Sequence, residues 1–160
     1  MKLTANFYFA YGSNMDAAQV EERGLAVVDR FWGCLEGYRL AFNKRAKHQP
    51  GVAHANVARC IGAQVEGAVY ALANPQSIEA MDPFEGYPER YERRVLAINT
   101  SRGVLEAWVY VANPAVIESG LAPTAGYLGR LLAGKDLLSH EYFERLERVE
   151  VVSVKKDASS

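Results

Sequence analysis

The segment "NFYFAY" at residues 6–11 is apolar at both alternations of an extended chain. Its odd-numbered positions, all aromatic, would share one face of a strand, while Tyr8 and Ala10 would share the other. Because both faces of such a strand would be apolar, the pattern predicts a strand that is covered on both sides by other parts of the protein. This strand runs directly into a polar Gly-Ser-Asn turn at 12–14.

Most of the remaining chain divides into short elements. Gly33 and Gly37 interrupt an extended pattern, as glycines do at bulges or tight bends. The polar residues 43–56 predict a loop. Short strands that do not alternate with long helices favour a small barrel or a strongly curled sheet over a doubly wound fold. The expected strands are 6–11, 26–42, 62–72, 90–98 and 104–112, the last two joined by a hairpin. Helices are expected after Asn14 as an N-cap, ending at Gly24, and over 74–86, 124–134 and 139–149, the last with Ser139 as its cap.

Composition places the chain among ordinary globular proteins. The 160 residues are 49% hydrophobic and 23% charged, which favours a single domain, expected at 1–150, with a tail at 151–160. The net charge of −1 gives no electrostatic argument for a nucleic acid or an anionic membrane as a partner. Two small basic clusters, at 44–47 and 155–156, are interpreted as a solvated loop and part of the tail.

Cys34 and Cys60 lack the spacing of a metal site, so we expect free thiols in the core of a protein from a reducing compartment. The first residues lack a secretory pattern, and no window approaches the roughly 18 apolar residues that a membrane span needs. A cytoplasmic protein is therefore expected. No HExxH or CxxC motif is present, so neither a metal nor another cofactor is predicted.

The turn Gly12-Ser13-Asn14 is the first candidate site. Glycine lets a ligand approach the backbone closely, and a turn before a helix presents free N–H groups that can hold a carboxylate or a phosphate. The same residues are also typical of a plain strand-to-helix turn. A Ser13 nucleophile is a further reading, but the flanking residues do not form G-x-S-x-G, and the three histidines (48, 54 and 140) form no recognisable triad pattern.

Glu85 is the second candidate, between Phe84 and Gly86 at the end of the helix expected over 74–86. An apolar neighbourhood and the negative end of a helix dipole would both raise the pKa of its carboxyl. A carboxyl with a raised pKa can take up a proton and return it near neutral pH. A surface glutamate before a turn fits the same pattern. Glu89 and Glu92 lie among arginines and are expected to form surface ion pairs.

Tyr127 is the third candidate, in "APTAGYLGRLL". Its hydroxyl could donate a hydrogen bond into a cleft, although a tyrosine at such a position can equally be half-buried packing. Tyr91 and Tyr110 allow the same two interpretations.

These elements occur in an order that resembles the γ-glutamylcyclotransferase family, whose wider group includes the AIG2-like proteins. The resemblance rests on "YFAYGSNM", "MDPFEGYPERYERR" and "PTAGYLGRLLAGKDLLSHEYFERL". It is strengthened by "GAQVEGAVYAL" before the glutamate-containing helix and by "RLAFNK" followed by "GVAHAN". Together these segments span most of residues 6–147.

The resemblance implies an α+β fold, a small mixed β-barrel with surrounding helices, and an enzyme that needs no cofactor. It implies that Tyr11, Gly12, Ser13 and Asn14 hold the γ-glutamyl end of a small-molecule substrate. Glu85 matches the catalytic acid/base of the family. Tyr127 matches a tyrosine that lines the substrate cavity.

The family reaction releases 5-oxoproline and a free amine or amino acid. The substrate's own α-amine attacks its γ-carbonyl, so no protein nucleophile is needed. The related glutathione-degrading group tends to carry a Tyr-Gly-Ser-Leu turn, so Asn14 favours the first group. A non-catalytic module that binds a γ-glutamyl or carboxylate ligand is the alternative. The leaving amine, the oligomeric state and the roles of the three arginines at 90, 93 and 94 stay open.

Overall fold

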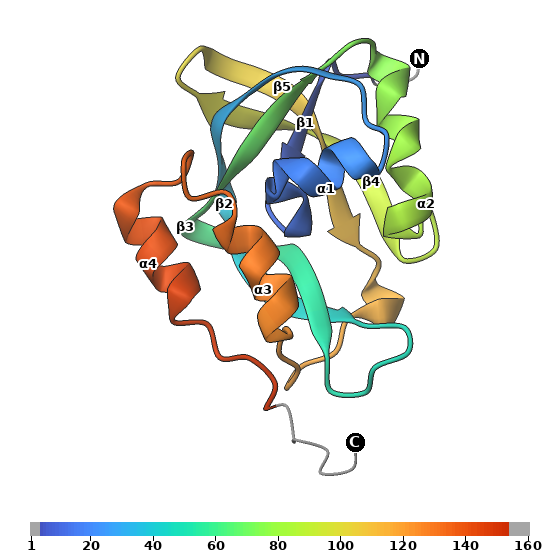
Figure 1. The fold of residues 1–160 in the computed structure, drawn as a ribbon, viewed down its shortest axis with the longest axis vertical. Helices are drawn as coiled ribbons and strands as arrows, with labels where there is room; N and C mark the ends of the chain where they lie inside the picture. The colour runs from blue at the N-terminus through green and yellow to red at the C-terminus, as the bar shows by residue number, and fades with distance from the viewer. Residues whose placement is uncertain (1–3, 154–160) are drawn as a thin grey trace.

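The computed structural model describes residues 4–153, and five strands in this range close into a barrel with helices around it (Figure 1). The basic pair at 155–156 and most of the predicted tail lie outside the described residues. The strands are β1 (Phe7–Ala10), β2 (Val27–Arg45), β3 (Ala53–Leu72), β4 (Tyr91–Thr100) and β5 (Gly103–Ala112). The α-helices are α1 (Ala17–Glu22), α2 (Asp82–Glu85), α3 (Ala125–Leu132) and α4 (His140–Glu147), and the short 3₁₀ helices are η1 (Ser13–Met15), η2 (Pro75–Ala80) and η3 (Pro114–Val116).

The strand order around the barrel is β1-β3-β2-β4-β5, and β5 returns to β1. All neighbouring pairs are antiparallel except β1 and β5, which run parallel where Tyr8 lies opposite Trp108. Closure gives β1 a hydrogen-bonded neighbour at each edge, and consecutive residues Tyr8, Phe9 and Ala10 are all buried, so both faces of the strand are covered as its sequence predicts. The α+β class, with a small mixed barrel and surrounding helices, is confirmed.

Two glycines shape the long strand β2 as its sequence predicts. Gly37 has a φ of 83°, and the pairing of β2 with β3 shifts register at this position. Only a residue without a Cβ adopts this left-handed conformation readily. Gly33 instead permits close packing, since a Cβ there would lie 2.5 Å from a methyl group of Val69.

The prediction of a loop over residues 43–56 is wrong at both ends of this range. β2 continues to Arg45 and β3 begins at Ala53, so Lys44 pairs directly with His54. The side chain of Lys44 is buried, whereas Arg45 and Lys47 are exposed as a solvated loop would require. Composition misled the prediction because side chains of an extended segment alternate between the inside and the outside of the barrel.

The expected N-cap at Asn14 is also wrong. The chain makes the short helix η1 first, and Asp16 then caps α1 by accepting a hydrogen bond from the backbone N–H of Ala18. The predicted end at Gly24 agrees with its φ of 82°. The side chain of Asn14 is buried instead of facing the helix terminus, which frees it for the contacts described below.

The remaining elements support the site from outside the barrel. Ser139 caps α4 as predicted, and Thr124 caps α3.

Cys34 is a buried free thiol and Cys60 is a partly buried free thiol. Within residues 4–153, no helix has the length and apolar character needed to cross a membrane.

Candidate active site

The turn after β1 is held on both sides by buried hydrogen bonds. The Asn14 amide donates to the Tyr8 hydroxyl at 2.9 Å, and the Tyr70 hydroxyl donates to the Asn14 carbonyl at 2.6 Å. The Tyr11 hydroxyl donates to the carbonyl of Tyr110 on β5 at 2.6 Å. Because its side chains are already engaged by the barrel, the turn keeps a defined shape without a ligand.

Gly12 lies where another residue would collide with the site. A Cβ at this position would lie 3.1 Å from the Tyr127 hydroxyl and 3.2 Å from the Cβ of Ala55. Its φ of −111° lies outside the left-handed region, and the close approach of Tyr127 and Ala55 favours a residue without a Cβ here. The N–H groups of Gly12 and Asn14 donate to no acceptor among residues 4–153, so they can serve a ligand.

Tyr127 reaches the turn from the first part of α3. Its hydroxyl accepts a hydrogen bond from the backbone N–H of Ala55 at 2.9 Å, and its ring stacks on His54 with a centroid separation of 4.8 Å. Burial raises the pKa of Tyr127 well above its usual range, so the hydroxyl keeps its proton. That proton can be donated to a ligand while the oxygen accepts from Ala55.

Glu85 is the last residue of α2, and Gly86 in the left-handed conformation ends the helix behind it. Its side chain is only 14% exposed, and its carboxylate lies 3.5 Å from Nη1 of Arg23. Burial raises the pKa of Glu85, while Arg23 and Lys44 lower it and Asp82 raises it further, with a net rise. The predicted direction of the pKa shift is therefore correct, and its first cause is burial, which corresponds to the apolar neighbourhood that the sequence indicated.

Glu85 and the turn meet at one cavity. A small cavity of about 30 Å³, here called the tyrosine cavity, is lined by Tyr8, Phe9, Tyr11, Gly12, Ser13, Asn14, Ala55, Glu85, Tyr91, Tyr110 and Tyr127. The structure thus brings together every site residue that the sequence predicted, although these residues come from the segment after β1, from η1, from α2 and from α3. Tyr91 and Tyr110, left undecided by the sequence, line the same cavity.

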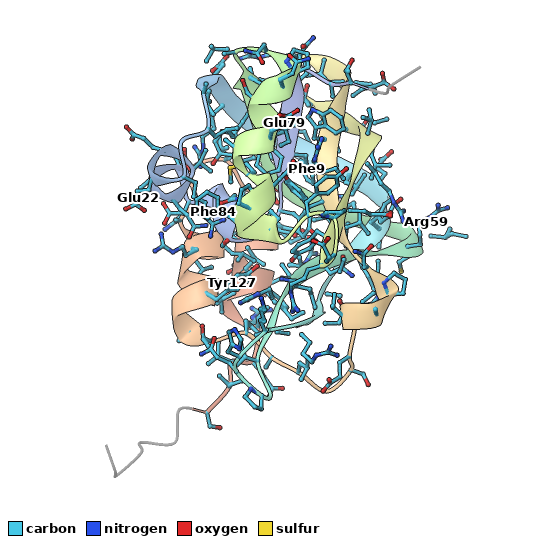
Figure 2. All side chains as sticks on the ribbon, turned by 90° about the vertical axis from the view of Figure 1, so that its right-hand side faces the viewer. Phe9, Glu22, Arg59, Glu79, Phe84 and Tyr127 are labelled. Atoms are coloured by element: carbon cyan, nitrogen blue, oxygen red, sulfur yellow. The ribbon has the colours of Figure 1, made fainter. Side chains whose placement is uncertain are left out.

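A larger cavity of about 460 Å³, here called the outer cavity, shares residues with the tyrosine cavity. Its size falls in the range of small-molecule sites, which is about 300–1,000 Å³. In Figure 2, Phe84 on α2 and Tyr127 on α3 lie on the same side of the barrel, and both line this cavity. Its lining residues are Ser13, Gln19, Arg23, Lys44, His54, Phe84, Glu85, Tyr91, Thr124, Gly126, Tyr127 and Arg130.

The outer cavity is rich in positive charge. Arg23, Lys44 and Arg130 line it, with Glu85 as the acidic group of the lining. Burial, assisted by Lys44, lowers the pKa of His54 to about 4, so this histidine is neutral near pH 7. Sequence reasoning did not select Arg23 as a site residue, and it interpreted Lys44 as part of a solvated basic cluster.

Ser13 is paired with an amide and not with a histidine. Nε2 of Gln19 donates to Ser13 Oγ at 2.9 Å. An amide NH₂ group cannot take up a proton from a hydroxyl, so this geometry does not activate Ser13 as a nucleophile. In the described part of the chain, no group of three or more His, Cys, Asp or Glu side chains is arranged to hold a metal ion.

The arginines that follow Glu85 occupy structural positions. Nε of Arg93 lies 2.8 Å from the Asp82 carboxylate, and Nε of Arg94 lies 2.5 Å from that of Glu92. Arg90 donates to the backbone carbonyl of Arg45. The ion pair expected for Glu92 is thus present at the surface.

Comparison with known proteins identifies a family that matches the sequence. The family described as gamma-glutamyl cyclotransferase, AIG2-like, matches residues 8–128. A search of curated proteins finds no match.

Solved structures share the fold. One described as a gamma-glutamyl cyclotransferase superposes with a TM-score of 0.81 at 22% identity, covering 94% of this chain and 91% of its own. An uncharacterized protein from Homo sapiens gives 0.80 at 24% identity, with the same coverage of 94% and 91%. A gamma-glutamyl cyclotransferase specific to glutathione, from yeast, gives 0.64 at 13% identity over 90% of this chain and 94% of its own. With a family match that spans most of its length and includes the turn, Glu85 and Tyr127, the chain belongs to the AIG2-like gamma-glutamyl cyclotransferase family.

Proposed function

We propose that this protein is a γ-glutamyl cyclotransferase that releases 5-oxoproline and a free amine or amino acid from a γ-glutamyl substrate. The observation that carries the proposal is the shared lining of the tyrosine cavity by Glu85 and the Gly12-Ser13-Asn14 turn. An acid/base residue and a set of unused N–H groups thus face one enclosed space. Family membership supports the same reaction type.

The reaction begins with a proton transfer to Glu85. The α-amine of a free γ-glutamyl group is mostly protonated at neutral pH, and its ammonium form cannot attack a carbonyl. The Glu85 carboxylate removes one proton, and burial favours this transfer because it raises the pKa of the carboxyl. General acid–base assistance of this kind contributes roughly 10²–10⁴-fold.

Ring closure follows from the neutral amine. Its nitrogen forms a bond with the γ-carbon, and the carbonyl oxygen becomes an oxyanion. When the oxyanion collapses, the bond between the γ-carbon and the leaving nitrogen breaks, and the proton on Glu85 passes to that nitrogen. The ring nitrogen still carries one proton more than the neutral lactam, and it loses this proton to the regenerated Glu85 carboxylate, from which it passes to the released amine or to water. Folding of the glutamyl chain into the reactive geometry supplies much of the acceleration, since well-oriented intramolecular reactions reach effective molarities of about 10⁵ M or more.

Binding groups for the glutamyl end come from the turn and from α3. The N–H groups of Gly12 and Asn14 hold the α-carboxylate or the developing oxyanion, and the Tyr127 hydroxyl donates a further hydrogen bond. Tyr11 and Ser13 complete this binding surface. The residues that fix the turn need not move during the reaction, which keeps these donors preorganised.

The test is 5-oxoproline release from a panel of γ-glutamyl amino acids and γ-glutamyl amines, measured by mass spectrometry. Glu85→Gln keeps the shape of the side chain and removes its proton chemistry, so turnover is expected to fall by roughly 10²-fold or more. Glu89→Gln is the matched control, because Glu89 is exposed and lines neither cavity. Near-normal turnover by Glu85→Gln would contradict the assignment. Tight binding of a panel member by calorimetry, without any 5-oxoproline, would instead establish the non-catalytic binding module.

A further inference from the structure

Lys44 presents an ammonium group to the outer cavity without a partner. The residue is 6% exposed and lines this cavity from the end of β2. Among residues 4–153 its nitrogen forms no hydrogen bond or ion pair, and it lies 4.6 Å from the centre of the Tyr91 ring. The nitrogen is not among the fully buried side-chain atoms that lack a hydrogen-bond partner, so it reaches the space of the cavity and can contact an anion there.

The other two cations of the outer cavity already have counter-ions. Arg23 lies 3.5 Å from the Glu85 carboxylate, and Arg130 lies 2.8 Å from the Asp16 carboxylate. Glu85 offsets part of the charge of Lys44 and raises its pKa, but Lys44 forms no ion pair with a carboxylate in the described part of the chain. Burial, with Arg90 nearby, lowers the pKa of Lys44 to about 8, so the group still carries its charge at neutral pH.

The position of Lys44 distinguishes it from the groups that hold the glutamyl end. Lys44 lines the outer cavity alone, whereas Glu85 and Tyr91 line both cavities. Because Glu85 lines both cavities, a substrate whose glutamyl end contacts the turn and Glu85 can extend its leaving group into the outer cavity, which Lys44 lines. The Lys44 ammonium is therefore on the side of the departing amine.

We propose that Lys44 binds a carboxylate carried by the leaving amine, so that γ-glutamyl amino acids and peptides are preferred over γ-glutamyl derivatives of neutral amines or polyamines. This inference rests on the proposed function. A charge-assisted hydrogen bond from a partly buried lysine corresponds to a preference of about 10- to 100-fold. A cationic leaving group would meet Lys44 as a like charge and is expected to be the poorest of the three classes.

The experiment compares γ-glutamyl-alanine with γ-glutamyl-alaninamide, which differ in charge but hardly in shape. The wild-type protein is expected to use the alanine compound with a kcat/KM about 10- to 100-fold higher. Lys44→Met should bring the ratio of the two kcat/KM values close to one, and Lys44→Arg should restore part of it. Lys47→Met is the matched control, because Lys47 is exposed and belongs to the adjoining loop.

The possible outcomes separate this inference from the proposed function. Equal use of both compounds by the wild-type protein, or an unchanged ratio in Lys44→Met, would overturn the role of Lys44 while leaving the reaction type intact. A parallel loss on both compounds would place the Lys44 contact on the glutamyl end and would also overturn it. If Lys44→Met does not fold, Lys44→Gln provides the same ratio. Absence of 5-oxoproline from every compound would remove the proposed function itself.

Discussion

The Arg23 guanidinium lies 3.5 Å from the Glu85 carboxylate, and the same nitrogen lies 3.1 Å from Oδ1 of Asn14. One side chain from the end of α1 thus connects the proposed acid/base with the buried asparagine of the turn. Nε2 of Gln19 supports the same asparagine oxygen at 2.9 Å. The arrangement couples the position of Glu85 to the turn that would hold the substrate.

Removing Arg23 should change the pH dependence of the reaction. The positive charge of Arg23 lowers the pKa of Glu85 and so opposes the larger effect of burial. In Arg23→Met the pKa of Glu85 rises further. Because the carboxylate form is required to accept the substrate proton, activity in this variant should already be lost at a higher pH when the solution is acidified. The acidic limb of a kcat/KM profile measures the change.

Arg130→Met is the control for this pH profile. Arg130 lines the same cavity, but its charge is paired with Asp16 at 2.8 Å. The acidic limb should therefore stay close to its wild-type position in this variant. If the acidic limb of the kcat/KM profile moves equally in both variants, or does not move in Arg23→Met, then the ion pair between Arg23 and Glu85 does not control the titration of Glu85.

Gly12→Ala and Gly129→Ala should have effects of opposite sign. A Cβ at Gly12 meets the Tyr127 hydroxyl at 3.1 Å and Ala55 at 3.2 Å, so overpacking is expected to lower the free energy of unfolding by about 1–3 kcal/mol and to reduce activity. At Gly129, on the exposed side of α3, a Cβ has no neighbour within 4 Å. Alanine there should stabilise the helix by up to about 1 kcal/mol.

Urea denaturation of both glycine variants, together with kcat/KM, provides the measurement. If the Gly12→Ala protein has wild-type stability and wild-type kcat/KM, then Tyr127 can move away from the turn without lowering the free energy of unfolding. That result would contradict the close approach that explains this glycine.

Tyr127→Phe should destabilise the protein, whereas Tyr142→Phe should not. The Tyr127 hydroxyl accepts the N–H of Ala55, a residue that is 1% exposed, so its removal leaves a buried donor unpaired at a cost of about 1–3 kcal/mol. The Tyr142 hydroxyl is buried without a hydrogen-bond partner in the described part of the chain. Removing that group should leave stability unchanged or slightly increased.

Thermal unfolding compares the two tyrosine variants, and kcat/KM adds a functional measurement. Tyr127→Phe should also lower kcat/KM, because it removes a donor from the tyrosine cavity, while Tyr142 lines neither the tyrosine nor the outer cavity. Equal melting temperatures of Tyr127→Phe and the wild-type protein would argue against the structural role of its hydroxyl.

Much of the fold follows from local patterns. The doubly apolar strand, the glycine bends, the hairpin near residue 100 and the cap at Ser139 are all signals within a few residues, and the structure agrees with each. Two errors share one cause. The polar residues 43–56 and the turn residue Asn14 were assigned from composition and cap preference, but tertiary contacts bury Lys44 and Asn14.

The sequence by itself determined the kinds of groups that this protein can use: a turn without bulky side chains, a carboxyl at a helix end and a tyrosine at the start of a helix. Only the tertiary structure decided that these groups line one cavity, because the turn after β1, the end of α2 and the start of α3 are far apart in the sequence. It also decided that Arg23 and Lys44 join them. The sequence of a polar stretch does not show whether the ammonium of a lysine reaches water or a cavity. The pleat and twist of the strand set the direction of the side chain, and these depend on the whole barrel.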